Sequence, residues 1–452
     1  MVLVLILVAL IAFIVLSTTR LKLHPFLALL AAALIAGFAY QLPPQDLIKT
    51  ISTGFGGILG NIGIVIVLGT IIGVILERSG AAITMAETVI KLLGERFPTL
   101  TMSIIGYLVS IPVFCDSGYV ILNSLKNALA ARMKVSVVAM SVALATGLYA
   151  THTFVPPTPG PIAAAGNLGL GDSLGLVIAI GLVVGLVTAF AGMLWANRFI
   201  GKDIVLEDNG TPLPAAEDFV ALKAQYGKLP SAFQAFAPIF VPILLICLGS
   251  IATFPSRPLG DGDLLAVLRF LGQPIVALLV GLAIACTLLK GNGKRQALHD
   301  RVAEGILSAA PIILITGAGG AFGAVLSATP LGAYLGATLS ALGVGLFMPF
   351  LVSAALKTAQ GSTTVALVTT SAMVAPLLGQ LGLDSEMGRV LTVMAIGAGG
   401  MTVSHANDSF FWVVTQFSRM PVAVAYRAQT MGTLVQGIAG IITVWLLSLV
   451  LL

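Results

Sequence analysis

The sequence predicts an all-α polytopic membrane protein made of two inverted-topology repeats, with about ten spanning helices and two re-entrant helical hairpins. Of its 452 residues, 58% are hydrophobic and 9% are charged, whereas a soluble globular protein carries about 25% charged residues. Apolar runs recur from end to end, with the length a helix needs to cross roughly 30 Å of hydrocarbon. Short motifs of the first half return in order in the second half.

The spanning helices are expected in the apolar runs 2–19, 24–42, 58–76, 135–155, 173–197, 234–254, 270–290, 309–328, 389–410 and 428–451. The first run has no basic residue before it and lacks a small-x-small cleavage motif, so we expect a retained helix and not a signal peptide. The polar, proline-containing segment 200–233 is expected to be a cytoplasmic linker. It separates a first membrane repeat, 1–199, from a second, 234–452.

Lysine and arginine in short loops predict the orientation, because such residues favour the cytoplasmic side. Arg20 and Lys22 follow the first run and no basic residue precedes it, so the N-terminus is expected outside the cell. Alternation from there places the basic segments 77–97, 132–134, 199–233 and 290–301 inside. Arg257 and Arg269 fall outside, where Asp261 and Asp263 offset them.

This alternation holds only if the chain between 98 and 131 returns to the side from which it entered. The arms 98–111 and 118–131 have 14 residues each and reach only about 21 Å, too short to cross. We therefore expect a re-entrant hairpin with its tip at "IPVFCDSGYVIL" (111–122), broken at Pro112 and Gly118. A second hairpin is expected over about 346–377, around Gly361.

The two halves resemble each other motif by motif. "GTIIGVIL" (69–76) resembles "GGAFGAVL" (319–326), and "THT" (151–153) corresponds to "SHA" (404–406). By the alternation above, 58–76 runs inward and 309–328 runs outward. Inverted repeats with helices broken at the bilayer centre are typical of secondary transporters.

Composition and motifs exclude several other classes. No G-x-x-x-x-G-K-[ST] motif occurs, so no ATP-driven step and no cofactor are expected. Cys115, Cys247 and Cys286 lack metal-ligand spacing, and neither a metal nor a disulfide is expected. The net charge of +5 lies in short loops, which suits membrane orientation better than nucleic-acid binding.

Asp116, at the first tip beside Ser117 and Gly118, is a candidate for ion or proton binding, because intramembrane acids mark such paths. It could instead cap a helix that begins at Gly118. Asp408 lies in "SHANDSFFW", a polar cluster inside an apolar run, together with Asn407 and Ser409. We expect Asp408 to carry the coupling proton, with Asp116 the second choice.

The second tip, "QGSTTVAL", offers half-helix amides and hydroxyls for an anion without a buried cation. The candidates are Gln360, Gly361, Ser362, Thr363 and Thr364. Their hydroxyls could instead bond their own helix backbone.

Further candidates lie where a helix is expected to break. His152 and Thr153 precede a run of four prolines between 156 and 161. His152 and His405 could relay protons or remain neutral hydrogen-bonding residues. Lys126 and Lys357, on the hairpin arms, are not expected to bind substrate.

The sequence resembles the gluconate permease family, GntP, over nearly its whole length. The resemblance rests on "HPFLALLAAALIAGF", "GGILGNIGIVIVLGTIIGVILERSGAA", the hairpin around Asp116, "HTFVPPTPGP", "ILITGAGGAFGAVL", "GSTTVAL" and "NDSFFWVVTQF". It implies a proton symporter of the bacterial inner membrane for gluconate or related small hydroxy acids, with some relatives carrying D-serine. It also implies a homodimer, paired hairpins and elevator-type movement.

Carried over by motif, the site residues that the resemblance implies are Asp116, Ser117, Gly118, His152, Gly361, Ser362, Thr363, Asn407 and Asp408. Some relatives have a glutamate-valine tip where this chain has Asp116-Ser117-Gly118. The carboxylate is kept but its reach is shorter, so a shorter acid such as glycerate fits equally well.

The expected mechanism is electroneutral symport, in which a carboxyl binds a proton before the anionic substrate can share the site. Sodium coupling through tip carbonyls is the alternative within transport. A passive channel would show no uphill accumulation. An intramembrane aspartyl protease with Asp116 and Asp408 as its dyad is a remote alternative, because neither aspartate lies in a G-x-G-D context.

Overall fold

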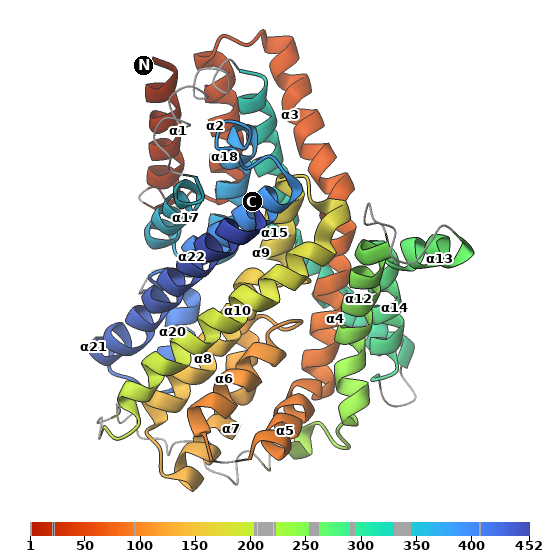
Figure 1. The fold of residues 1–452 in the computed structure, drawn as a ribbon, viewed down its shortest axis with the longest axis vertical. Helices are drawn as coiled ribbons and strands as arrows, with labels where there is room; N and C mark the ends of the chain where they lie inside the picture. Colours follow the sequence, from red (N-terminus) through yellow and green to blue (C-terminus); the bar gives the residue numbers. More distant parts are fainter. Residues whose placement is uncertain are drawn as a thin grey trace.

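A computed structural model describes residues 2–19, 21, 23–94, 96–202, 206, 220, 223–252, 262–289, 294–329, 345–405 and 408–452. These residues form helices and no strands (Figure 1). The helices of the first half are α1 Val2–Thr19, α2 Pro25–Ala39, α3 Pro44–Ile58, α4 Ile64–Ser79, α5 Ala81–Leu93, α6 Pro98–Val109, α7 Cys115–Met133, α8 Val137–Phe154, α9 Pro159–Asn167 and α10 Leu174–Ala196.

The second half continues the all-helical architecture that the sequence predicts. Its helices are α12 Ala232–Ala252, α13 Asp263–Leu271, α14 Pro274–Cys286, α15 Lys294–Ser327, α17 Phe347–Gln360, α18 Thr363–Val374, α19 Glu386–Met401, α20 Ser409–Phe417, α21 Val422–Ala425 and α22 Met431–Leu451. By length and hydropathy alone, five of the described helical stretches can cross a membrane, or seven when two bent pairs are each counted as one. The expected runs 24–42 and 389–410 contain α2 and α19, which at 15 and 16 residues are too short to be counted.

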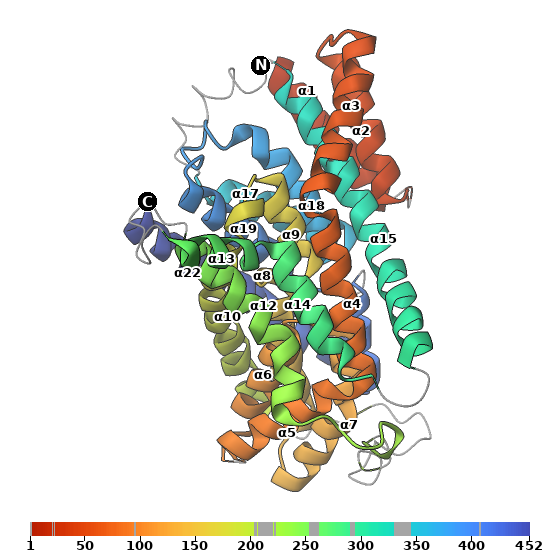
Figure 2. The same cartoon turned by 90° about the vertical axis from the view of Figure 1, so that its right-hand side faces the viewer.

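Two long helices run antiparallel beside each other. α3 continues through a π-helical turn, Leu59–Gly63, into α4, and α15 packs along both (Figure 2). Both helices begin well before the expected runs 58–76 and 309–328, at Pro44 and at Lys294. Hydropathy detects only the apolar part of a helix, whereas backbone hydrogen bonding continues into the polar residues before it. This antiparallel placement is the arrangement that repeats of opposite topology require.

Glycines match between these two helices. Two glycines of α4 lie against proline backbones. A β-carbon at Gly73 would lie 2.4 Å from the carbonyl oxygen of Pro112, and one at Gly69 would lie 3.0 Å from that of Pro157. In α15, Gly323 lies against the carbonyl of Ala372 in α18 in the same manner, and Gly319 lies against the side chain of Val368 in α18. The repeated motif "GxxxG" therefore seats one re-entrant hairpin against each long helix.

The first hairpin is α6 and α7, joined by the non-helical tip 110–114. α7 begins at Cys115, so the expectation that Gly118 breaks the helix and that Asp116 precedes it is wrong. Pro112 ends the helical hydrogen bonding by itself. Gly118 is instead a packing position inside α7, since a β-carbon there would lie 2.8 Å from Cδ2 of Leu148.

The second hairpin and two helix breaks follow the sequence more closely. α17 ends at Gly361, whose φ of +88° is favoured by glycine. Ser362 then caps α18, its hydroxyl accepting from the amide of Val365. α8 and α9 are separated at the prolines, and α19 and α20 at the predicted break before Ser409.

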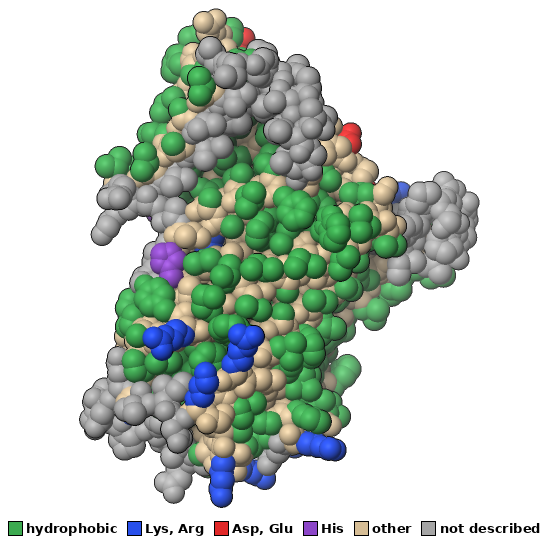
Figure 3. Space-filling view, turned by 60° about the vertical axis from the view of Figure 1, so that its left-hand side comes forward, with side chains coloured by type: hydrophobic (Ala, Val, Ile, Leu, Met, Phe, Trp, Pro, Cys, Tyr) green, Lys and Arg blue, Asp and Glu red, His purple; other side chains and the backbone are tan. Residues whose placement is uncertain are grey.

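Basic side chains gather at one end of the molecule. On the face in Figure 3, most lysines and arginines lie on the lower third, below a broad apolar surface. This end, called the basic end below, carries the exposed residues Arg78, Lys91, Arg96, Arg132 and Lys134 near the termini of α4, α5 and α7. The described part of the linker packs here on α5, where Lys223 pairs with Glu87 at 2.6 Å.

Candidate functional site

The two hairpin tips meet at one cavity of about 270 Å³. Its lining residues are Phe114, Cys115, Asp116, Tyr149, His152, Gly361, Ser362, Thr363, Thr364, Asp408, Ser409 and Phe410. The volume lies just below the roughly 300–1,000 Å³ of pockets for drug-sized ligands. Segments far apart in the sequence, from both halves of the chain, therefore line one cavity large enough for a small molecule.

Three of the described helices begin at this cavity. α7 begins at Cys115, α18 at Thr363 and α20 at Ser409, and all three positions line it. A helix N-terminus carries about half a positive charge and unpaired backbone N–H groups. The convergence of three helix N-termini favours binding of an anion in the cavity. The sequence of the second tip alone also predicts an anion site.

Lys357 and Asp408 form a buried ion pair at the cavity wall. The lysine Nζ lies 2.7 Å from Asp408 Oδ2, with the lysine side chain 0% exposed, and it also donates to the carbonyl of Gly361. Asp408 accepts further bonds from the Ser404 hydroxyl at 2.5 Å and the Phe410 amide at 3.0 Å. Both oxygens of Asp408 are thus engaged, and the site contains the buried cation that the sequence did not lead us to expect.

Asp116 has a different environment. Its Oδ1 is buried and accepts no hydrogen bond from the described residues, and its Oδ2 lies 3.8 Å from the Cys115 thiol. No lysine, arginine or histidine nitrogen in the described part of the chain lies within 4.0 Å of this carboxyl. Of the two cavity aspartates, only Asp408 has its charge neutralised by a side chain.

α8 contributes an aromatic and an imidazole side chain from one helix face. The Tyr149 hydroxyl hydrogen-bonds the Thr363 hydroxyl at 2.5 Å, joining α8 to the second tip. The His152 ring packs against the Phe114 ring in a tilted arrangement, with ring centroids 6.0 Å apart. Its Nδ1 has no hydrogen-bond partner among the described residues. Sequence reasoning found His152 and missed Tyr149, although a spacing of three residues places both on one face.

Four of the predicted residues are described by the structure but do not line the cavity, namely Ser117, Gly118, Thr153 and His405. The Ser117 side chain faces Glu77 of α4, and the Thr153 hydroxyl donates to the carbonyl of Tyr149 in its own helix at 2.7 Å. Gly118 packs on Leu148. His405 contacts the carbonyl of Thr358 through Nε2 at 2.9 Å. The side chain of Gln360 and the whole of Asn407 lie outside the described residues.

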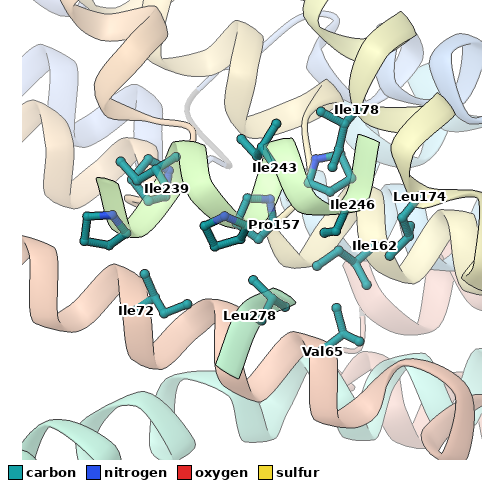
Figure 4. Close-up of a pocket in the computed structure, with 14 residues that line it drawn as sticks. Val65, Ile72, Pro157, Ile162, Leu174, Ile178, Ile239, Ile243, Ile246 and Leu278 are labelled. Carbon is teal, nitrogen blue, oxygen red and sulfur yellow. The ribbon is translucent and has the colours of Figure 1, made fainter. Parts of the chain in front are cut away.

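A second cavity has the wrong chemistry for a polar ligand. It measures about 20 Å³ and lies between the first tip, α4, α9, α10, α12 and α14. Figure 4 shows isoleucines of α12 facing Pro157, Ile162 and Leu278 across it. All of its lining side chains are apolar, so it is an apolar interface between elements. In the described part of the chain, no cluster of three His, Cys, Asp or Glu side chains could hold a metal ion.

Comparison with known proteins adds family relationships to this geometry. The family model described as GntP family permease matches residues 1–450. The chain is 34% identical to a gluconate permease of Pseudomonas aeruginosa, over 98% of this chain and 97% of that protein. It is 31% identical to the D-serine transporter DsdX of Escherichia coli, over 98% and 97%. Among solved structures, the YdaH transporter of Alcanivorax borkumensis has a similar fold, with a TM-score of 0.67, 14% identity and coverage of 93% of this chain and 98% of that one.

Proposed function

Because the chain belongs to the GntP family of permeases and is a multi-pass membrane transporter rather than an enzyme, we propose that it imports a small hydroxy-carboxylate together with protons. Gluconate, a related sugar acid or a shorter glycerate-like acid is the proposed substrate. The relatives are named for gluconate and for D-serine, and both compounds carry a carboxylate and at least one hydroxyl. The cavity offers groups suited to each.

In this proposal the substrate carboxylate lies among the N-termini of α7, α18 and α20. Unpaired backbone amides of helix N-termini bind carboxylates without a matching side-chain charge. The substrate hydroxyls bond to Ser362, Thr363, Thr364 and Ser409, which line the cavity. Asn407 is proposed as a further ligand from its sequence alone.

The observation that carries the coupling mechanism is the difference between the two aspartates. Asp408 pairs with Lys357 and accepts bonds on both oxygens, so we propose a structural role for it. Asp116 faces the same cavity without a cation beside it. We therefore reverse the order expected from the sequence and propose Asp116 as the proton carrier.

Proton binding and substrate binding depend on each other in this mechanism. Two bare carboxylates in a cavity of low dielectric repel strongly. A proton on Asp116 removes that repulsion, so the anion enters only after protonation and leaves before deprotonation. One proton and one anion cross together, and the cycle is electroneutral.

The proposed orientation places the basic end in the cytoplasm and the N-terminus outside a bacterial inner membrane, following the preference of lysine and arginine for the cytoplasmic side.

We propose a homodimer in which the hairpins move as an elevator. The apolar interface of Figure 4 supports such movement, because the first tip and α9 meet α12 and α14 there without a polar contact that would have to break.

Transport by purified protein in proteoliposomes tests this function. Labelled sugar acids, short hydroxy acids and D-serine are offered with a proton gradient, a sodium gradient or neither. We expect uphill accumulation of a hydroxy acid driven by protons. Accumulation driven by sodium alone would contradict proton coupling, and cleavage of peptides without any uptake would contradict transport.

The Asp116→Asn variant isolates the coupling step. The amide mimics the protonated carboxyl, so counterflow of substrate should persist near the wild-type rate while proton-driven accumulation is lost. Asp172→Asn, at an exposed carboxyl between α9 and α10, is the matched control and should keep both activities. Full proton-driven accumulation by Asp116→Asn would remove this residue from the mechanism.

A further inference from the structure

One face of α7 is polar and buried along most of its length. Asp116, Tyr119, Asn123, Lys126 and Asn127 follow helical spacing and lie on one side of the helix. The last four are each less than a tenth exposed. From Asp116 to Asn127 the helix rises about 16 Å, so this polar face leads from the cavity toward the basic end.

Lys126 is a buried lysine without a carboxylate partner among the described residues. Its side chain is 0% exposed. Its Nζ donates to Ser418 Oγ at 2.9 Å and to the Tyr119 hydroxyl at 3.4 Å, and it lies 5.2 Å from the centroid of the Tyr119 ring. Within the described residues no carboxylate lies within 4.0 Å of it. The C-terminus of α20, at Ser418, supplies only about half a negative charge. Lys357, by contrast, has Asp408.

The neighbouring amides also lack partners. Asn123 Oδ1 and both polar atoms of the Asn127 side chain are buried and make no hydrogen bond within the described residues. Leaving a buried polar group unpaired is destabilising, and native proteins pair most such groups. A buried lysine followed by a side-chain amide without a partner is chemically suited to bind a carboxylate ligand. In this conformation the described side chains leave no opening from the cavity to these groups.

We propose that Lys126, Asn127 and Tyr119 form a second carboxylate-binding station, on the path between the cavity and the basic end. This proposal rests on the proposed function and adds a second resting place for the same substrate class. The Lys126 ammonium supplies the charge, and the Asn127 amide and the Tyr119 hydroxyl donate hydrogen bonds.

The station is closed in this structure by contacts between α7 and α20. The hydroxyls of Tyr119 and Ser418 hydrogen-bond at 2.5 Å. The Tyr119 ring also packs edge-on against Phe410, a cavity residue, with centroids 6.2 Å apart. Substrate can pass from the cavity to Lys126 only when these two aromatic side chains separate.

Charge-selective labelling tests the station without any knowledge of the substrate. Asn127→Cys is introduced into full-length protein whose three native cysteines are replaced by alanine. Inside-out and right-side-out vesicles are then treated with an anionic ethylsulfonate methanethiosulfonate or with its cationic trimethylammonium counterpart. We expect labelling from the basic-end side only, with the anionic reagent faster by about tenfold or more.

Two variants connect that preference to Lys126. Lys126→Met should abolish the preference for the anionic reagent, and Lys126→Arg should keep it. Leu125→Cys, buried at the same depth on the opposite face of α7, is the matched control and should stay unlabelled. Absence of labelling at position 127 from both sides, equal rates for the two reagents, or a preference unchanged in Lys126→Met would overturn the station.

A transport measurement completes the test and separates the two proposals. Asn127→Leu loses no hydrogen bond in this structure, so its melting temperature should not fall, while substrate counterflow should slow by about tenfold. Wild-type counterflow in Asn127→Leu would overturn the station while leaving the proposed function intact. The opposite result is charge-selective labelling together with no transport of any hydroxy acid. It would overturn the proposed function and would indicate that the station serves anions of another class.

Discussion

At the scale of single residues, the ion pair of Lys357 and Asp408 decides how the cavity handles charge. The two residues come from different helices, because Lys357 lies near the end of α17 and Asp408 caps α20. Each charge is buried and depends on the other, because removing one partner leaves an uncompensated charge in a medium of low dielectric. Asp116 has no such partner among the described residues, which is why we propose it as the proton carrier.

This dependence predicts a strong coupling in stability. Lys357→Met and Asp408→Asn should each lower the free energy of unfolding by about 3–5 kcal/mol, whereas the double variant should lose much less than their sum. Thermal unfolding in detergent measures the effect. Lys223→Met, which breaks the more exposed pair with Glu87, should cost at most about 1 kcal/mol. Additive losses in the double variant would show that the two charges do not compensate each other.

At the scale of elements, glycines on the two long helices hold the re-entrant hairpins in place. Gly73 of α4 lies against the carbonyl of Pro112 at the first tip, and Gly323 of α15 lies against the carbonyl of Ala372 behind the second. Each contact lets backbone approach backbone, which a larger side chain prevents. The position of the tips, and with it the cavity, depends on these contacts.

Gly73→Ala should therefore weaken substrate binding by displacing the first tip, since the new methyl group overlaps the Pro112 carbonyl. Binding of substrate, measured by thermal shift, should fall by about tenfold or more. The control is Gly57→Ala in α3, where a β-carbon meets nothing within 4 Å. Alanine there should leave binding unchanged and raise helix stability by up to about 1 kcal/mol. Equal binding by the two variants would contradict a positioning role for Gly73.

At the scale of the whole molecule, the two long helices run in opposite directions (Figure 2), as the predicted inverted repeats require. α3 begins at the end of the molecule where the N-terminus lies, and α15 begins toward the opposite, basic end (Figures 1 and 2). Asp46 and Lys294, in the first turns of these helices, are both exposed. The proposed orientation therefore puts them on opposite sides of the membrane.

Cysteines at these two positions test the orientation directly. In whole cells, an impermeant thiol reagent should label Asp46→Cys and leave Lys294→Cys protected until the membrane is permeabilised. The reason is the basic end, which the positive-inside preference holds in the cytoplasm. Labelling of position 294 with protection of position 46 would invert the proposed topology.

The sequence by itself determined the helical class, the two hairpins, the helix breaks near His152 and Asp408, and those tip residues, Asp116 and 361–364, that share the cavity. Each of these follows from local properties. Hydropathy marks the apolar part of a helix, and proline or glycine marks where its hydrogen bonding ends. The sequence did not predict that α3 begins at Pro44 or that α7 begins at Cys115. Polar and small residues also adopt helical conformation, so hydropathy and glycine do not mark these helix starts.

Only the tertiary structure decided which side chains meet. Lys357 reaches Asp408 across 51 residues and Tyr149 reaches Thr363 across 214, while Ser117 turns toward Glu77 and away from the cavity. Such contacts depend on how each helix is rotated about its axis, and helix packing sets that rotation. In a chain so uniformly apolar, hydropathy does not reveal the inward face of a helix, so a buried lysine and its aspartate could be paired only once the helices were in place.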